Sequence, residues 1–336
     1  MRAASEDTRY GFAIGRVRAL EARLFDRQQW DRLVRARDAE EFRSLFAETD
    51  YARGAQQDAG AAGAQETGAL LAAASAENFA FLARYCEDEW VLDLFRLLAD
   101  VHNLKVTAKA ALAGRELPGT ALLDYGRWDA DQLAALAGAQ RGAKPERFRA
   151  AVAEARNRWE SGPVPAFLDA VLDRAGRAEV AAAVRDNEFL AGYFDLAADV
   201  QNLRALVRVK LLGENRDAVL EAMLPGGSIA PRRLAGLLGE DWAAVAAAFR
   251  LTRYGPMMEQ GIAGLVNSGS LLRFERLGRE LELDWLSRAR YMTFGFEPLV
   301  GYYLFRENEI ANLRRLAVAK SAGLGEADCA ELVAHA

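Results

Sequence analysis

The segment DVHNLKVTAKAALAG, residues 100–114, occurs a second time along the chain as DVQNLRALVRVKLLG, residues 199–213. Six of the fifteen positions are identical, and two more exchange Lys for Arg. A third, more divergent copy lies in ENEIANLRRLAVAKSAGL, which begins at Glu307. When the shared Asn is aligned, the copies are 99 and then 110 residues apart. The sequence therefore predicts a threefold internal repeat, in which each unit closes on a long helix.

Each copy carries an acid three positions before the Asn, which places both side chains on one face of a helix. We expect these pairs to form a buried structural lock on polar groups of an adjacent helix, near an arginine such as Arg16 or Arg18. The pairs are Asp100 and Asn103, Asp199 and Asn202, and Glu309 and Asn312.

A cation stands two positions after the Asn in every copy. It follows the acid by five positions, about 140° around a helix, so the two cannot pair within their own helix. The cation is therefore expected to face solvent, a cavity or a partner protein, and the sequence leaves these alternatives open. The three cations are Lys105, Arg204 and Arg314. A glycine eleven positions after each Asn is predicted to end the helix, at Gly114, Gly213 and Gly323.

Good helix formers dominate the whole chain, chiefly Ala, Leu, Arg and Glu, and the alternating runs typical of strands are scarce. The sequence therefore predicts an all-α fold. A first helix is expected from about residue 10 to 25, and a Gly-rich connector from 54 to 68. The repeats divide the chain into three helical units, at residues 1–114, 115–213 and 214–336.

The composition disfavours several classes of partner. A net charge of −5 gives no electrostatic reason to bind nucleic acid or an anionic lipid surface. The two cysteines make no disulfide framework and fit a reducing cytosol. The N-terminus lacks an apolar signal core, and no stretch reaches the roughly 18 apolar residues that a spanning helix needs. Any work at a membrane is expected to be done from the aqueous side, through a partner.

Residues with reactive side chains are few and follow no catalytic motif. Of the two histidines, His102 is replaced by Gln and Ala in the other copies. No Cys/His set has zinc spacing, and no Gly-Lys-Ser/Thr forms a phosphate-binding loop. Asp195 and Asp199 could hold Mg²⁺ together, but the matching positions of the other copies do not preserve the pair. We therefore expect no catalytic, cofactor-binding or metal-binding residues.

The two ends of the chain carry the most specific patterns. TRYGFAIGRVRALEARLFDRQQWDRLVRARDAEEFRSLFAETDY, residues 8–51, resembles the N-terminal signature of the C subunits of V/A-type ATPases, whose counterpart in the eukaryotic vacuolar enzyme is the d subunit. FGFEPLVGYYLFRENEIANLRRLAVAKSAGL, residues 294–324, resembles the C-terminal signature of that family. The repeated DV(H/Q)NL(K/R) segments match its first two repeats, so the resemblance covers essentially the whole chain. The connector at 54–68 is looser than is typical of the family.

This resemblance implies three similar helical units around a pseudo-threefold axis, shaped like a funnel. It also implies a non-catalytic rotor adaptor, which seats the central shaft, made of D- and F-type subunits, on the membrane proteolipid ring. Such an adaptor transmits torque for ion transport or ATP synthesis, is cytoplasmic, and is peripheral to the membrane without inserting into it. In that setting Lys105, Arg204 and Arg314 would contact an acidic shaft. Two alternatives are a helical-repeat scaffold for another protein partner and an all-helical enzyme with a pocket of clustered carboxylates.

Overall fold

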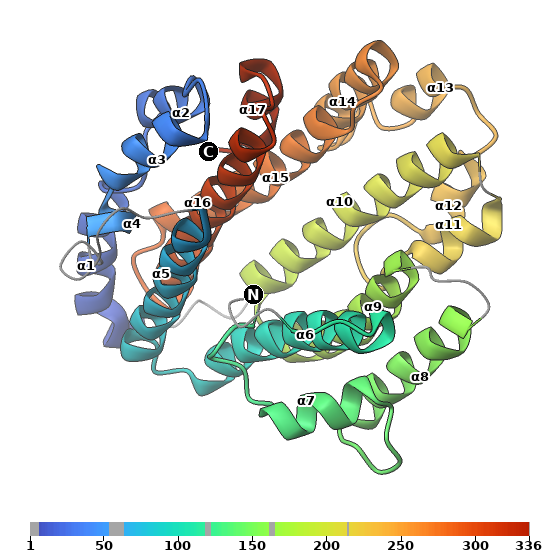
Figure 1. The fold of residues 1–336 in the computed structure, drawn as a ribbon, viewed down its shortest axis with the longest axis horizontal. Helices are drawn as coiled ribbons and strands as arrows, with labels where there is room; N and C mark the ends of the chain where they lie inside the picture. The colour runs from blue at the N-terminus through green and yellow to red at the C-terminus, as the bar shows by residue number, and fades with distance from the viewer. Residues whose placement is uncertain (1–6, 54–63, 118–121, 161–164, 214, 336) are drawn as a thin grey trace. The chain divides into compact units, whose positions relative to one another are not determined.

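The computed structural model describes residues 7–53, 64–117, 122–160, 165–213 and 215–335. Within these ranges all regular secondary structure is helical and no strand is present (Figure 1). The predicted all-α fold class is confirmed. None of the described helices is long and apolar enough to cross a membrane.

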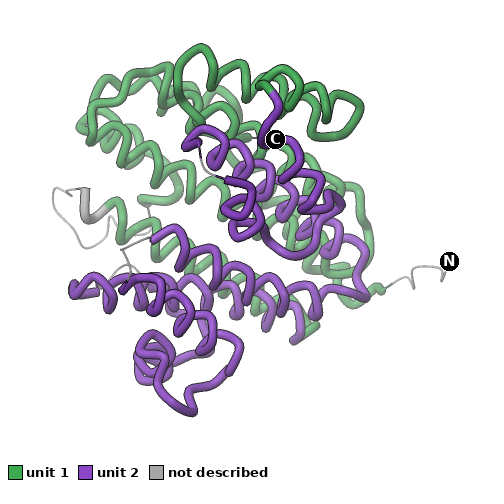
Figure 2. Tube along the Cα trace, turned by 90° about the vertical axis from the view of Figure 1, so that its right-hand side faces the viewer, with its two compact units in different colours: residues 1–88, 241–336 green, residues 89–240 purple. Residues whose placement is uncertain are grey.

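The chain divides into two compact units, which Figure 2 shows in different colours. Unit 1 combines both ends of the chain, residues 1–88 and 241–336. Its α-helices are α1 (Gly11–Glu21), α2 (Arg27–Val34), α3 (Ala39–Ala47), α4 (Asp50–Arg53), α5 (Ala64–Tyr85), α13 (Trp242–Ala247), α14 (Gly255–Ser268), α15 (Leu272–Ser287), α16 (Glu297–Ser321) and α17 (Glu326–Leu332). Single 3-10 turns occupy Thr8–Tyr10 and Arg288–Tyr291.

Unit 2 is the continuous segment 89–240. Its helices are α6 (Glu89–Ala113), α7 (Ala130–Ala137), α8 (Glu146–Glu160), α9 (Pro165–Val184), α10 (Glu188–Leu212), α11 (Arg216–Ala222) and α12 (Pro231–Gly236). The division of the chain into three units at residues 114 and 213 stays a prediction.

Each copy of the repeat forms one helix of 25 residues, namely α6, α10 and α16. All three begin at a Glu, whose negative charge is favourable at a helix N-terminus. Beyond their C-termini, Gly114, Gly213 and Gly323 have φ values of 61°, 68° and 72°. A glycine adopts this left-handed conformation without steric cost. The predicted glycine stops are confirmed.

Two predicted boundaries differ from the observed ones. The first helix ends at Glu21 instead of extending to Phe25, because the Phe25 N–H leaves the helix to bind a side chain on α16. The predicted connector continued to residue 68, but α5 already begins at Ala64. The earlier part of that connector, residues 54–63, lies outside the described residues.

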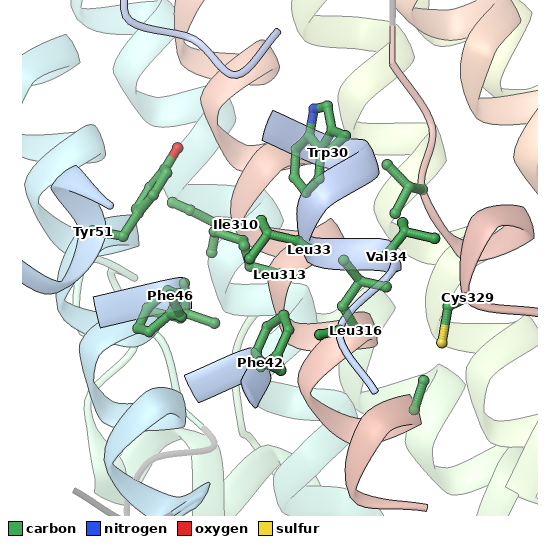
Figure 3. Close-up of a cluster of buried hydrophobic side chains, with 14 of the residues drawn as sticks. Trp30, Leu33, Val34, Phe42, Phe46, Tyr51, Ile310, Leu313, Leu316 and Cys329 are labelled. Carbon is green, nitrogen blue, oxygen red and sulfur yellow. The ribbon is translucent and has the colours of Figure 1, made fainter. Parts of the chain in front are cut away.

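The core of unit 1 joins the two ends of the chain (Figure 3). Trp30 and Leu33 of α2 and Phe42 of α3 pack in one cluster with Leu313 and Leu316 of α16. All five side chains are buried. Helices as short as α2 and α3 are unstable alone, and burial of each large apolar side chain contributes about 1.5–3 kcal/mol. Helix α16, the last long helix described, therefore holds α2 and α3 in place.

The core of unit 2 surrounds α6, which packs against α7 and α9, while α8 packs along α9. Leu94 and Leu104 on α6, Leu136 on α7, and Leu168 and Leu172 on α9 are buried at 1% exposure or less. This packing fixes α6, which carries the first of the repeated polar pairs.

Candidate functional site: three repeated anchors

The acid and Asn of the first repeat bind the segment that follows α6. Asn103 donates from Nδ2 to the Leu123 carbonyl at 2.8 Å, and its Oδ1 accepts the Leu123 N–H at 2.8 Å. Buried Asp100 accepts the N–H groups of Arg127 at 2.6 Å and Trp128 at 3.0 Å, and the Nε–H of Arg127 at 3.1 Å. The two side chains therefore anchor the chain at two points on its way into α7.

The second repeat makes the same anchor on the segment that leads into α12. Asn202 donates to the Leu224 carbonyl at 3.1 Å and accepts the Leu224 N–H at 2.7 Å. Asp199 accepts the N–H and the hydroxyl of Ser228 at 2.8 and 2.7 Å, and the N–H of Ile229 at 3.0 Å. The two aspartates therefore have equivalent surroundings.

A glycine precedes the bound N–H groups in both of these repeats. A Cβ atom added to Gly126 would lie 2.7 Å from Asp100 Oδ1, and one added to Gly227 would lie 2.4 Å from Asp199 Oδ1. The absence of a side chain lets the backbone approach the carboxylate closely. These glycines were not predicted as part of the site, although each lies four positions before the first residue of the helix that the anchored segment enters, α7 or α12.

The third repeat builds its anchor from two distant parts of the chain. Asn312 donates to the Ala334 carbonyl at 2.8 Å and accepts the Ala334 N–H at 3.4 Å. Asn103 and Asn202 make the same pair of contacts with Leu123 and Leu224. Glu309 instead accepts the N–H of Phe25 and the hydroxyl of Tyr51, the latter at 2.7 Å. The N-terminal segment thus supplies the acid's partners, which come from the following loop in the other two repeats.

Helices α2 and α7, which begin just after the residues bound by Glu309 and Asp100, also match in their N-terminal caps and in length. Asp26 caps α2 by accepting the N–H of Gln29, and Asp129 caps α7 by accepting the N–H of Gln132, both at 2.8 Å. Both helices are eight residues long. In its cap and in the contact made by the residue before that cap, α2 therefore resembles α7.

A lysine eight positions after the Asn adds a further contact in the second and third repeats. Buried Lys320 donates to the Val34 carbonyl, at the end of α2, at 2.7 Å. Lys210 donates to the Leu238 carbonyl, just beyond α12, at 2.9 Å. A positive charge at the last carbonyls of a helix is favourable. The sequence shows these two lysines at the same position of their repeats, although they were not predicted as site residues. Ala111 takes their place in the first repeat.

The predicted partner of the acid and Asn was an adjacent helix near Arg16 or Arg18, and this is wrong. The partners are chiefly backbone groups of connecting segments, because buried loop N–H and C=O groups have no helix to satisfy them. Arg18 lies elsewhere and donates to the carbonyls of Ala289 and Met292 at 3.0 and 2.8 Å.

The acids of the third repeat lie in an apolar environment. Burial raises the pKa of Glu309 above its usual range, against the opposing effect of the Tyr51 and Phe25 hydrogen bonds. Burial likewise raises the pKa of Glu307, which accepts hydrogen bonds from Ser75 and Asn78 at 2.8 Å each. These two carboxyl groups therefore resist ionisation.

The three repeated cations have different surroundings. Lys105 forms an ion pair with Asp173 of α9, and both line a cavity of about 1140 Å³ in unit 2. Arg204 lines the same cavity and is half-buried. Arg314, in unit 1, donates to the Leu71 carbonyl of α5 at 3.1 Å. Only the first two share a surface within one unit.

The described residues contain no cluster of three or more His, Cys, Asp and Glu side chains suited to a metal ion. Cys86 and Cys329 are both buried, and their sulfur atoms lie 3.7 Å from the carbonyl oxygens of Asp88 and Leu324. The arrangement of the anchors is suited to holding loops against helices, and the chemistry that we can assign to it is hydrogen bonding.

Known proteins resemble this chain along nearly its full length. The family described as ATP synthase (C/AC39) subunit matches residues 13–332. The C subunit of the A-type ATP synthase of Methanothermobacter thermautotrophicus is 26% identical, over 97% of this chain and 88% of its own length. The proteins of the same name from Haloferax volcanii and Haloquadratum walsbyi are each 26% identical, over 96% and 94% of this chain and 97% and 95% of their own lengths. The resemblance predicted from the two ends of the chain is confirmed, and the chain belongs to the family of ATP synthase (C/AC39) subunits.

Proposed function

We propose that this chain is a non-catalytic rotor adaptor of a V/A-type ATPase, seating the central shaft on the membrane proteolipid ring. Torque would pass through it for ion transport or ATP synthesis. The observation that carries the proposal is the family match across residues 13–332, together with relatives named as C subunits of A-type ATP synthases. Its partners would be the D- and F-type shaft subunits and the ring, and it would be a cytoplasmic protein held at the membrane by the complex.

The proposal includes three similar helical units, 1–114, 115–213 and 214–336, around a pseudo-threefold axis that forms a funnel. The equivalent contacts of α6, α10 and α16 support it, because in each repeat the Asn binds both backbone groups of one residue in the segment that follows. Phe25 and Tyr51 of the first unit would then supply the partners of Glu309 in the third.

A protein that transmits torque has to resist deformation, and the anchors suit this role. Buried hydrogen bonds to charged groups contribute about 1.5–3 kcal/mol each and require specific geometry. Anchored loops would therefore move with their long helices as single bodies instead of yielding under load.

We also propose that Lys105, Arg204 and Arg314 contact acidic groups of the shaft. Half-buried Arg204, at the wall of the large cavity of unit 2, supports this part best. Lys105 already neutralises Asp173, so its contribution would depend on exchange of that ion pair.

Affinity purification of the tagged chain from native membranes in mild detergent tests the proposal. The shaft, head and proteolipid subunits are expected to copurify with it. Deletion of its gene should abolish ATP-driven ion transport while the released head still hydrolyses ATP, as a non-catalytic adaptor requires. Recovery of the chain with an unrelated partner and without any rotary ATPase component would support the helical-repeat scaffold instead.

A further inference from the structure

A second, smaller cavity in unit 1 belongs to none of the anchors. Its volume is about 370 Å³, and α1, α4, α5 and α16 line it. This volume lies within the range of small-ligand sites and is too small for a helix of a partner protein. Phe81 and Tyr302 form part of its wall, with ring centroids 5.5 Å apart in an edge-to-face arrangement.

Three arginines line this cavity: Arg16 and Arg23 from α1 and the turn after it, and Arg306 from α16. Arg16 stacks over Tyr85, and Arg306 over Tyr51, with guanidinium carbons 5.5 and 4.7 Å from the ring centroids. Arg306 also interacts electrostatically with the carboxyl group of Glu309, whose ionisation is opposed by burial.

Like charges from the two ends of the chain therefore meet across one small space. Asp50 and Glu77 also line the cavity, and they are exposed, as Arg16 and Arg23 are, so solvent screens charges of both signs there. Counting all five charged side chains, the lining carries a formal charge of +1. Several guanidinium groups gathered in one recess are an arrangement that binds compact oxyanions with several acceptor oxygens.

We propose that this cavity is a binding site for a phosphate group, either free phosphate or the phosphomonoester of a small organic molecule or lipid headgroup. Arg16, Arg23 and Arg306 would donate to its oxygens, and the aromatic wall would contact an attached organic group. The bound anion would bridge α1 to α16 and so tighten the contact between the two ends of the chain. The site goes beyond the proposed rotor function and does not depend on it.

Isothermal titration calorimetry of the purified chain with inorganic phosphate, at constant ionic strength, tests the site directly. Saturable binding to one site is expected, with chloride in place of phosphate giving none. The Arg23→Gln variant, which changes an exposed side chain, should weaken binding at least about tenfold, because it removes one charge-assisted donor. Arg27→Gln is the matched control, since Arg27 is exposed on α2, outside the cavity, and should leave binding unchanged.

Flotation with vesicles separates the two sources of the phosphate group. Binding to phosphatidic acid vesicles, lost in Arg23→Gln and absent with phosphatidylcholine, would assign the site to a lipid headgroup. Calorimetric binding of free phosphate without flotation would assign it to a soluble ligand. If neither probe binds, or if Arg23→Gln and Arg27→Gln reduce binding equally, the proposal is overturned, whatever the outcome of the copurification experiment.

Discussion

Asn312 and Ala334 are joined by two hydrogen bonds, in which the side-chain amide pairs with both backbone groups of one residue. The same two-way contact joins Asn103 to Leu123, and Asn202 to Leu224. A carboxamide can present an N–H donor and its carbonyl acceptor side by side, as a peptide group does. One Asn side chain can therefore satisfy both the C=O and the N–H of a single residue. The shared Asn is therefore explained by a loop that needs both of its backbone groups satisfied.

Replacing Asn312 by Ala should destabilise unit 1 by about 2–4 kcal/mol, because the buried Ala334 N–H loses its acceptor and the Ala334 carbonyl loses one of two donors. Urea denaturation followed by circular dichroism measures this change. Asn308→Ala is the matched control, since Asn308 donates to the same carbonyl at 2.9 Å and accepts nothing from Ala334. Its cost should be about 1 kcal/mol, and equal losses in the two variants would contradict the two-way contact.

The pH dependence of stability should reflect Glu309. Burial raises its pKa above the ordinary value of 4.5, so between 4.5 and the raised pKa the folded state holds a proton that the unfolded state has lost. Stability therefore falls as the pH rises through this window. Glu309→Gln cannot ionise and keeps an acceptor for the Phe25 N–H, so its free energy of unfolding should fall less between pH 4.5 and about pH 7.5.

The comparison is made by urea titrations across the pH range. Glu307→Gln should flatten the profile in the same direction, since burial raises the pKa of that carboxyl group too. Exposed Glu40, changed to Gln, serves as the control. A Glu309→Gln profile that follows the wild-type slope would show that this carboxyl group is not protonated preferentially in the folded state.

The sequence predicted the helices and their stops well, because both depend on residues that repeat at fixed positions. The identity of the partners was not predictable in the same way. Leu123, Leu224 and Ala334 contribute backbone groups, which any residue type offers, so they leave no shared side-chain pattern. Acid and Asn alone could not distinguish a loop partner from a helix partner.

The contact of the N-terminal segment with Glu309 was harder still to predict. The shared signal is short: an Asp followed three residues later by Gln, at 26 and 29 and at 129 and 132, and seven residues later by Leu33 and Leu136. This pattern is a common start of a helix anywhere in a protein. Its meaning depends on α16 bringing Glu309 to Phe25, a contact between residues 284 positions apart.

Gly227 should tolerate substitution less than Gly213. Both have positive φ, 84° and 68°, so an alanine is strained at either position. Only at Gly227 would the new Cβ lie 2.4 Å from Asp199 Oδ1, whereas at Gly213 it meets nothing within 4 Å. Gly227→Ala is expected to cost at least about 1 kcal/mol more than Gly213→Ala, measured by thermal denaturation. Equal costs would mean that the loop moves away from the carboxylate easily.

The proposed contact of the repeated cations with the shaft is tested by changing Lys105, Arg204 and Arg314 together to Glu. Affinity for the isolated complex of D- and F-type subunits should fall at least about tenfold at low salt, and the difference should shrink near 0.5 M salt, because screening weakens exposed charge pairs.

The matched control changes three exposed arginines, Arg37, Arg185 and Arg250, to Glu, which alters the net charge equally. A Glu at position 105 would face Asp173 and repel it, which can unfold the protein for a reason unrelated to binding. A second triple variant that combines Lys105→Gln with the two Arg→Glu changes therefore separates loss of folding from loss of binding. Shaft affinity that is unchanged in both folded triple variants would remove these cations from the interface and leave the family assignment intact.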